Sequence, residues 1–156
     1  KLDDLELSDL WDIGYSAQAD GSNPNGVPRL SSAFGSPQRF FFPIGSSTVV
    51  TFEELIEQQL GADAAADLNM VYFKAVENFD FDNASTSGDL DAISVSSDDP
   101  QTFDIPLTGA AGTTIAFLDQ YGKKGVIRID ELIDGDSDGN FFEANDGVQF
   151  DIIVQQ

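Results

Sequence analysis

The sequence predicts an all-β protein, an immunoglobulin-like or jelly-roll β-sandwich that carries one short α-helix. Short runs of alternating apolar and polar residues recur along the chain with turn-forming residues between them, which indicates a sandwich rather than a sheet of βαβ units. The 156 residues suffice for one domain with a sizeable core and are too few for two. We therefore expect a single domain over residues 1–156.

Composition excludes several classes of protein. Cys and His are both absent, which removes disulfides, thiolate nucleophiles, Ser-His and Cys-His triads and most transition-metal sites. The formal net charge of −21 disfavours nucleic acid as a partner, because binding to a phosphate backbone draws on clustered Lys and Arg. The charge favours a saline or calcium-containing exterior, where salt screens the repulsion among carboxylates.

The first part of the chain is predicted to contain one strand and a long loop. The strand is indicated by alternating apolar residues, namely Trp11, Ile13, Tyr15 and Ala17. Residues 20–28 are rich in Gly, Pro, Asn and Ser, and we expect their loop to continue to about residue 37. Residues 1–37 could form an extended N-terminal arm and loop, and residues 5–17 could be a strand lent to a neighbouring copy.

Residues 39–44, Arg-Phe-Phe-Phe-Pro-Ile, are the most apolar short run in the chain. The alternation of a strand would place Phe40 and Phe42 on one side and Phe41 on the other, so either both faces are covered or one ring is exposed. One interpretation is a covered strand that ends at Pro43, because proline cannot donate to the ladder. The other is a self-association surface made by the three Phe side chains.

One helix is predicted over residues 51–60. Thr51 and Glu54 fit a capping box at its start, and Gly61 fits the position just after its end. The apolar stripe of this helix consists of Phe52, Leu55, Ile56 and Leu60. A further short helical turn is expected over residues 63–67.

The remaining strands are predicted from short apolar runs between turns. They cover residues 70–76, 90–96, 102–107, 113–118, 125–133 and 148–154. Residues 120–125 are expected to join two of them as a hairpin. In the last strand the alternation predicts that one set of side chains faces the core, namely Val148, Phe150, Ile152 and Val154.

The C-terminal strand pattern resembles a known group of domains. Residues 113–129, the acidic turn that follows and the last strand through Gln155 are similar to the terminal strands of immunoglobulin-like sandwich domains in Bacteroidetes surface lipoproteins. The resemblance implies an exported domain with a structural or binding role, and it transfers no site residue. Small, very acidic β-sandwiches, including single jelly rolls, also serve as capsid or decoration subunits of viruses that infect halophilic hosts.

The acidic turn at residues 134–139, Asp-Gly-Asp-Ser-Asp-Gly, is the candidate metal site. Asp134, Asp136 and Asp138 occupy positions 1, 3 and 5 of a calcium loop, Gly139 supplies the sharp turn at position 6, and Asn140 stands at position 7. This spacing brings three carboxylates to one point, where a hard cation relieves their repulsion. Calcium is therefore the predicted cofactor.

The rest of the metal shell is left open by the sequence. Glu143 or Asp146 could complete it, and Asn145 stands at position 12 where an EF-hand has Glu, so a true EF-hand is not expected. A solvated acidic turn is the alternative to a calcium site. Sodium or potassium bound at high salt is a third interpretation.

The sequence predicts a non-catalytic extracellular module with a structural or binding role, a subunit of a cell-surface assembly that forms homo-oligomers or binds other surface subunits. The alternative is a capsid or decoration protein of a virus that infects a halophilic host.

A second acidic cluster, interpreted as a solvated face, consists of Asp80, Asp82, Asp89 and Asp91. No specific carboxylate pair suits glycoside hydrolysis, so no enzyme is expected. No apolar run is long enough to predict a membrane-spanning segment.

Overall fold

The structure is a computed structural model that describes residues 12–18, 27–36, 39–41, 47–84, 86–98, 103–107, 111–139, 141 and 145–155. Its strands are β1 (Ile13–Gln18), β2 (Val27–Ser32), β3 (Arg39–Phe41), β4 (Val49–Thr51), β5 (Val71–Val76), β6 (Asp104–Pro106), β7 (Thr114–Asp119), β8 (Lys124–Ile133) and β9 (Gly147–Val154). Its helices are α1 (Phe52–Leu60), α2 (Ala62–Ala66) and α3 (Ser87–Asp91).

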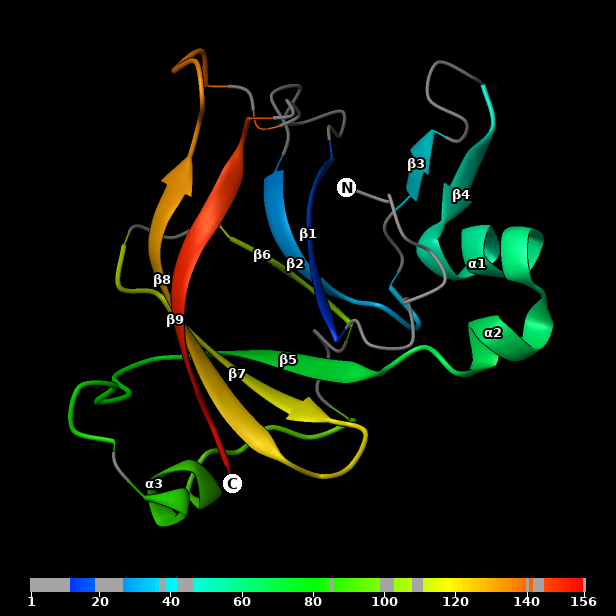
Figure 1. Ribbon diagram of the computed structural model, residues 1–156. Helices are drawn as coiled ribbons and strands as arrows, with labels where there is room; N and C mark the ends of the chain where they lie inside the picture. Colours follow the sequence, from blue (N-terminus) through cyan, green and yellow to red (C-terminus); the bar gives the residue numbers. More distant parts are fainter. Residues whose placement is uncertain are drawn as a thin grey trace.

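The predicted all-β sandwich is confirmed. A three-stranded antiparallel sheet with the order β1-β2-β6 faces a four-stranded antiparallel sheet with the order β5-β7-β8-β9, and β3 and β4 form a separate two-stranded ribbon beside α1 and α2 (Figure 1). The predicted hairpin is also present, because β7 and β8 pair through a turn that begins after Asp119.

The main core lies between the two large sheets. The β1-β2-β6 side contributes Leu30 and Ile105, with Leu107 just after β6, and the other side contributes Val71, Phe73, Ile115, Phe117, Ile127 and Ile129. Ile13 and Tyr15 of β1 pack against this cluster. The predicted apolar face of the first strand is thus confirmed for these two residues, while Trp11 lies outside the described residues.

The outer face of the β5-β7-β8-β9 sheet is covered as well. Residues 77–84 and 86–98, which include α3 and are called the crossing chain below, lie on the side of this sheet away from β1 and β2 (Figure 1). The crossing chain buries Leu90, Ile93 and Val95 against Ala116 and Val126. Residues 115–117 of β7 and 125–127 of β8 are therefore buried on both faces, which explains why neither stretch contains a charged or polar side chain.

Two sequence-based assignments are wrong. The strand predicted over residues 90–96 is the end of α3 followed by irregular chain, because its apolar side chains cover the outside of the sheet instead of joining its ladder. The loop predicted for residues 20–37 contains β2, which lies between β1 and β6. Pro28 stands near the start of β2, a position that tolerates proline, and its carbonyl accepts a 2.7 Å hydrogen bond from the Leu107 N–H.

The helix predicted over residues 51–60 is confirmed as α1. Thr51 and Glu54 form the predicted capping box, with hydrogen bonds of 2.8 and 3.1 Å. Two further short helices are present, α2 at the predicted helical turn and α3 at a place where none was predicted. In the described part of the chain no helix is both long and apolar enough to cross a membrane.

The Phe-rich run is only partly described. Arg39–Phe41 forms β3 and pairs with β4, which confirms the start of the predicted strand. Phe42, Pro43 and the side chains of Phe40 and Phe41 lie outside what the structure describes. The predicted self-association surface at these three Phe residues stays a prediction.

The last strand is present as β9, but its predicted burial is wrong. Phe150, Ile152 and Val154 are 40%, 47% and 44% exposed, although they share the core-facing side with Val148, which packs against the main core. The two large sheets approach each other most closely along β5, which contacts β6 and β2. The facing sheet therefore covers β5, β7 and β8 and leaves β9 open.

Gly125 of β8 provides a test of this packing. A Cβ at this position would overlap the Phe117 ring and lie 2.7 Å from the carbonyl oxygen of Ile153, whereas a Cβ at Gly147 would meet no heavy atom within 4 Å. Gly125→Ala should therefore lower the free energy of unfolding by about 1–3 kcal/mol, the usual cost of overpacking. Gly147→Ala, the control in denaturant unfolding, should be neutral or slightly stabilising. Equal effects would contradict the packing described.

Candidate cation site in the β8–β9 loop

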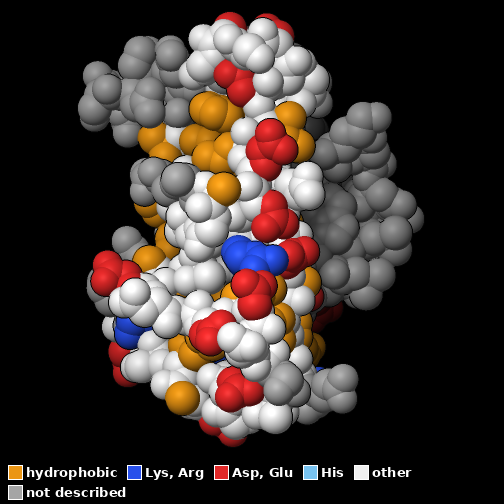
Figure 2. Space-filling view, turned by 90° about the vertical axis from the view of Figure 1, so that its left-hand side faces the viewer, with side chains coloured by type: hydrophobic (Ala, Val, Ile, Leu, Met, Phe, Trp, Pro, Cys, Tyr) orange, Lys and Arg blue, Asp and Glu red, His pale blue; other side chains and the backbone are white. Residues whose placement is uncertain are grey.

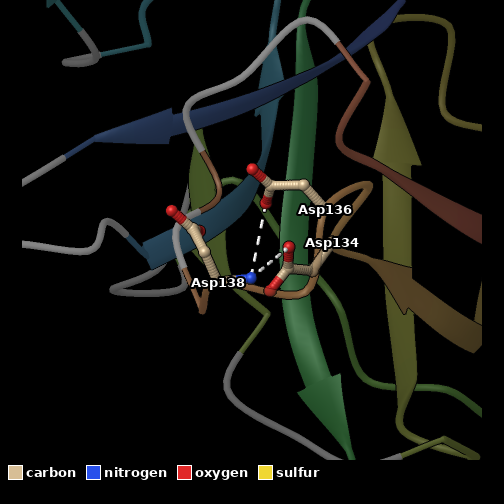
Figure 3. A group of neighbouring side chains, drawn as sticks. All are labelled: Asp134, Asp136 and Asp138. Atoms are coloured by element: carbon tan, nitrogen blue, oxygen red, sulfur yellow. Dashed lines mark hydrogen bonds between the residues drawn. The ribbon is translucent and has the colours of Figure 1, made fainter.

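The loop between β8 and β9 brings together the three carboxylates that the spacing predicted. Asp134, Asp136 and Asp138 each offer an oxygen, and these oxygens all lie within 4.8 Å of one another (Figure 3). No other group of three acidic side chains within the described ranges converges in this way. The three predicted ligands thus form one cluster.

Backbone hydrogen bonds shape the loop around Asp134. Its carboxylate accepts from the N–H of Asp138 at 3.2 Å and from the N–H of Gly139 at 2.6 Å, and the Asp138 N–H also lies 3.3 Å from the Asp136 carboxylate (Figure 3). Gly139 and Ser137 adopt positive φ values of 82° and 62°. Glycine accepts this conformation readily, which accounts for the need for Gly at position 6 of the loop.

The electrostatic environment differs between two of the carboxylates. Desolvation, followed by the negative charges of Asp138 and Asp134, raises the pKa of Asp136. Desolvation also acts to raise the pKa of Asp134, but hydrogen bonds from the backbone of Gly139, Ser137 and Asp138 outweigh it and lower that pKa. Asp134 is therefore stabilised as an anion by the loop itself. At Asp136 desolvation and repulsion outweigh the one backbone hydrogen bond from Asp138, and a cation would relieve that repulsion.

Residues 145 and 146 close the loop from its other end. The Gly135 N–H donates a 2.9 Å hydrogen bond to the Asp146 carboxylate, and a Cβ on Gly135 would overlap the Asn145 side chain. Asp146, one of the two residues proposed to complete the shell, therefore lies beside the first turn of the loop. Asn140 and Glu143, the other predicted ligands, lie outside the described residues.

Tyr15 of β1 is a neighbour of this site that the sequence did not indicate. Its buried hydroxyl has no hydrogen-bond partner in the structure. Burial, followed by the negative charge of Asp146, raises the pKa of Tyr15. The alternation predicted that Tyr15 lies on the apolar face of its strand, but nothing in the sequence placed it near a loop more than a hundred residues later.

The second predicted acidic cluster is not a single site. Its four carboxylates make separate contacts, which are Asp80 with Asn83, Asp82 with Arg128, Asp89 with Thr86 and Asp91 with Gln155. The distances of these contacts are between 2.6 and 3.0 Å. All four side chains are exposed, which agrees with the predicted solvated face. Within this face Asp89 caps α3, while Asp82 and Asp91 connect the crossing chain to β8 and to Gln155.

Comparison of the chain with known proteins finds no match among protein-family models, curated sequences or solved structures. The resemblance to immunoglobulin-like domains of surface lipoproteins stays a prediction.

The opposite pKa shifts of Asp134 and Asp136 predict opposite effects of neutralising them in metal-free protein. A lowered folded pKa means that ionised Asp134 contributes stability above its unfolded pKa, which is lost as the pH falls through the folded value. A raised folded pKa means that ionised Asp136 costs stability near neutral pH. Asp134→Asn should therefore lower the melting temperature near pH 7, and Asp136→Asn should leave it unchanged or raise it.

The measurement is thermal unfolding followed by circular dichroism, in excess chelator. Below the ordinary pKa of Asp the Asp136→Asn variant should approach the wild type, because Asp136 is then protonated. The Asp134→Asn variant should do so only as the pH falls through the lowered folded pKa of Asp134. A lower melting temperature for Asp136→Asn than for Asp134→Asn near pH 7 would contradict the assignment of the two roles.

Proposed function

We propose that the protein is a non-catalytic structural or binding module of an extracellular assembly, suited to a saline or calcium-containing medium, in which the β8–β9 loop holds a calcium ion. The observation that carries the proposal is the convergence of the Asp134, Asp136 and Asp138 carboxylates within 4.8 Å. A module of this kind uses the ion to fix a loop rather than to perform a reaction.

The donor set favours a hard cation. Calcium binds six to eight oxygen ligands, from carboxylates, carbonyls and water, and this chain has neither His nor Cys to offer softer metals. The structure supplies three carboxylates, with Asp146 beside them at Gly135. Asn140 and Glu143 are the sequence candidates for further oxygens. Sodium or potassium at high salt could occupy the same donors more weakly.

The contacts of two Arg residues support a structural role for the scarce positive charges. Arg29 of β2 donates from Nε to both oxygens of Asp104 of β6, at 2.6 and 2.8 Å. Arg128 of β8 lies 2.6 Å from carboxylates of both Asp82 and Asp151. Figure 2 shows basic side-chain atoms surrounded by acidic ones on one face of the molecule. These guanidinium groups bind the fold's own carboxylates.

The acidic surface predicts a strong dependence of stability on salt. At a net charge of −21, added NaCl or KCl should raise the melting temperature over a broad molar range, because salt screens the repulsion among exposed carboxylates. The Debye length of the solution falls to about 3 Å at 1 M salt. Melting curves in a salt series, with chelator present, measure this effect. A melting temperature that is flat or falls between low and molar salt would contradict the proposed adaptation.

Calcium should act at much lower concentration and through the loop alone. At fixed ionic strength, calcium at about 10 mM, roughly ten times the weaker dissociation constants of extracellular sites, should raise the melting temperature by about 3–5 °C through preferential binding to the folded state. Asp136→Asn should remove this increment and keep the salt response. The calcium increment is expected to be smaller than the salt effect.

Glu57→Gln is the matched control for the calcium experiment. It removes one negative charge from an exposed residue of α1, outside the loop, so both the salt response and the calcium increment should persist. Magnesium at the same concentration should act more weakly, because Mg²⁺ dehydrates reluctantly and demands octahedral geometry. A wild-type melting temperature that calcium does not move would reduce the loop to an acidic turn.

A further inference from the structure

Strand β9 forms an open edge of the larger sheet. Among the described strands its one hydrogen-bonded neighbour is β8. The Gln155 N–H donates to the carbonyl of Lys124 at 2.9 Å, so Gln155 faces β8 with its backbone. Backbone groups alternate in direction along an antiparallel strand. Ile153 and Asp151 therefore also face β8, and the N–H and C=O groups of Phe150, Ile152 and Val154 face away from it.

The same three residues carry the exposed apolar side chains of this strand, and they are called the β9 stripe below (Phe150, Ile152 and Val154). Their exposed fractions of 40–47% arise because the β1-β2-β6 sheet does not extend over them. The three residues of the β9 stripe thus offer both outward backbone groups, which can hydrogen-bond to another strand, and apolar side chains, which another strand can bury. This combination is what strand addition to a sheet edge uses.

We propose that the β9 stripe is a dimerisation surface, on which β9 of a second copy of this chain pairs antiparallel about a two-fold axis at Ile152. Residues 149–155, Gln-Phe-Asp-Ile-Ile-Val-Gln, are nearly self-complementary about this centre. The axis places Ile152 opposite itself and Phe150 opposite Val154 of the second copy, so each strand's outward backbone groups meet the other's. Gln149 meets Gln155 on the other face.

The distribution of charge favours a second copy as the occupant. Asp151 is the one charged residue of Gly147–Val154, and its carboxylate lies 2.6 Å from Arg128 Nη2. In the two-fold register it stands opposite Ile153, so the seam joins no like charges although each chain carries a net charge of −21. A basic partner would instead be drawn to the acidic surface elsewhere. The devices that usually protect an edge strand, Lys and Pro, are absent from β9.

The dimer goes beyond the proposed function and does not require calcium. Its two sheets would join into one continuous sheet, and the β9 stripes of the two copies would cover each other along the joined strands. Repulsion between the acidic remainders opposes association, so salt should strengthen it. Dimerisation and calcium binding can accordingly be tested separately.

The first experiment is sedimentation velocity of the full chain in molar NaCl with chelator, from about 1 μM to about 1 mM, a range that covers weak and moderate affinities. The wild type should shift reversibly from monomer to dimer. Ile152→Lys should remain monomeric, and Val154→Lys should do the same if Ile152→Lys does not fold. Leu60→Lys is the matched control, since it makes the same change at a 41% exposed residue of α1 and should still dimerise.

The second experiment tests the register. Because the chain has no Cys, Ile152→Cys introduces a single thiol at the proposed axis, and mild oxidation should link two copies through it. Tyr121→Cys, at a 77% exposed position of the β7–β8 turn, should cross-link far less. A wild type that stays monomeric throughout, a Lys variant that dimerises like the control, or a dimer that Ile152→Cys fails to link would each overturn the proposal.

Discussion

The structure depends on the burial of β7 and β8 on both faces. Phe117 and Ile127 belong to the core between the sheets, while Ala116 and Val126 belong to the cluster under the crossing chain. A pair of strands buried in this way must be covered on two sides. The β1-β2-β6 sheet covers one side, and the crossing chain (residues 77–84 and 86–98) covers the other. The close contact of Phe117 with Gly125 fits the same demand, since a side chain there would separate β8 from its neighbours.

The crossing chain is held against the outer face of the larger sheet by polar contacts from the few basic residues of the protein. Arg128 of β8 lies 4.4 Å from the centre of the Phe81 ring and binds Asp82 and Asp151. These hydrogen bonds raise the pKa of Arg128. Lys124 donates from Nζ to the carbonyl of Ile93 at 2.6 Å. The basic side chains of β8 thus contact both the crossing chain and the edge strand β9, where they also lower the repulsion among nearby carboxylates.

The sequence predicted what local patterns determine and missed what only tertiary structure determines. Alternation predicted most of the strands, and the capping box predicted α1. The turn-forming residues before β2 concealed a central strand, and the apolar spacing of residues 90–96 suited a strand as well as a covering segment. The three Asp of the loop were found because their ligands are close in sequence, whereas the approach of Tyr15 to Asp146 depends on how the sheets face each other.

The cation-site loop and the open edge belong to the same hairpin. Asp134 follows the last residue of β8 and Asp146 precedes the first residue of β9, where Ile133 pairs with Gly147. An ion bound between these ends would fix the register of the hairpin beyond the irregularity at Ile129 and Glu131, while the core, which lies further along both strands, would form without it. A bound ion would therefore order the start of β9, the strand whose outer backbone groups and apolar side chains are open to a partner.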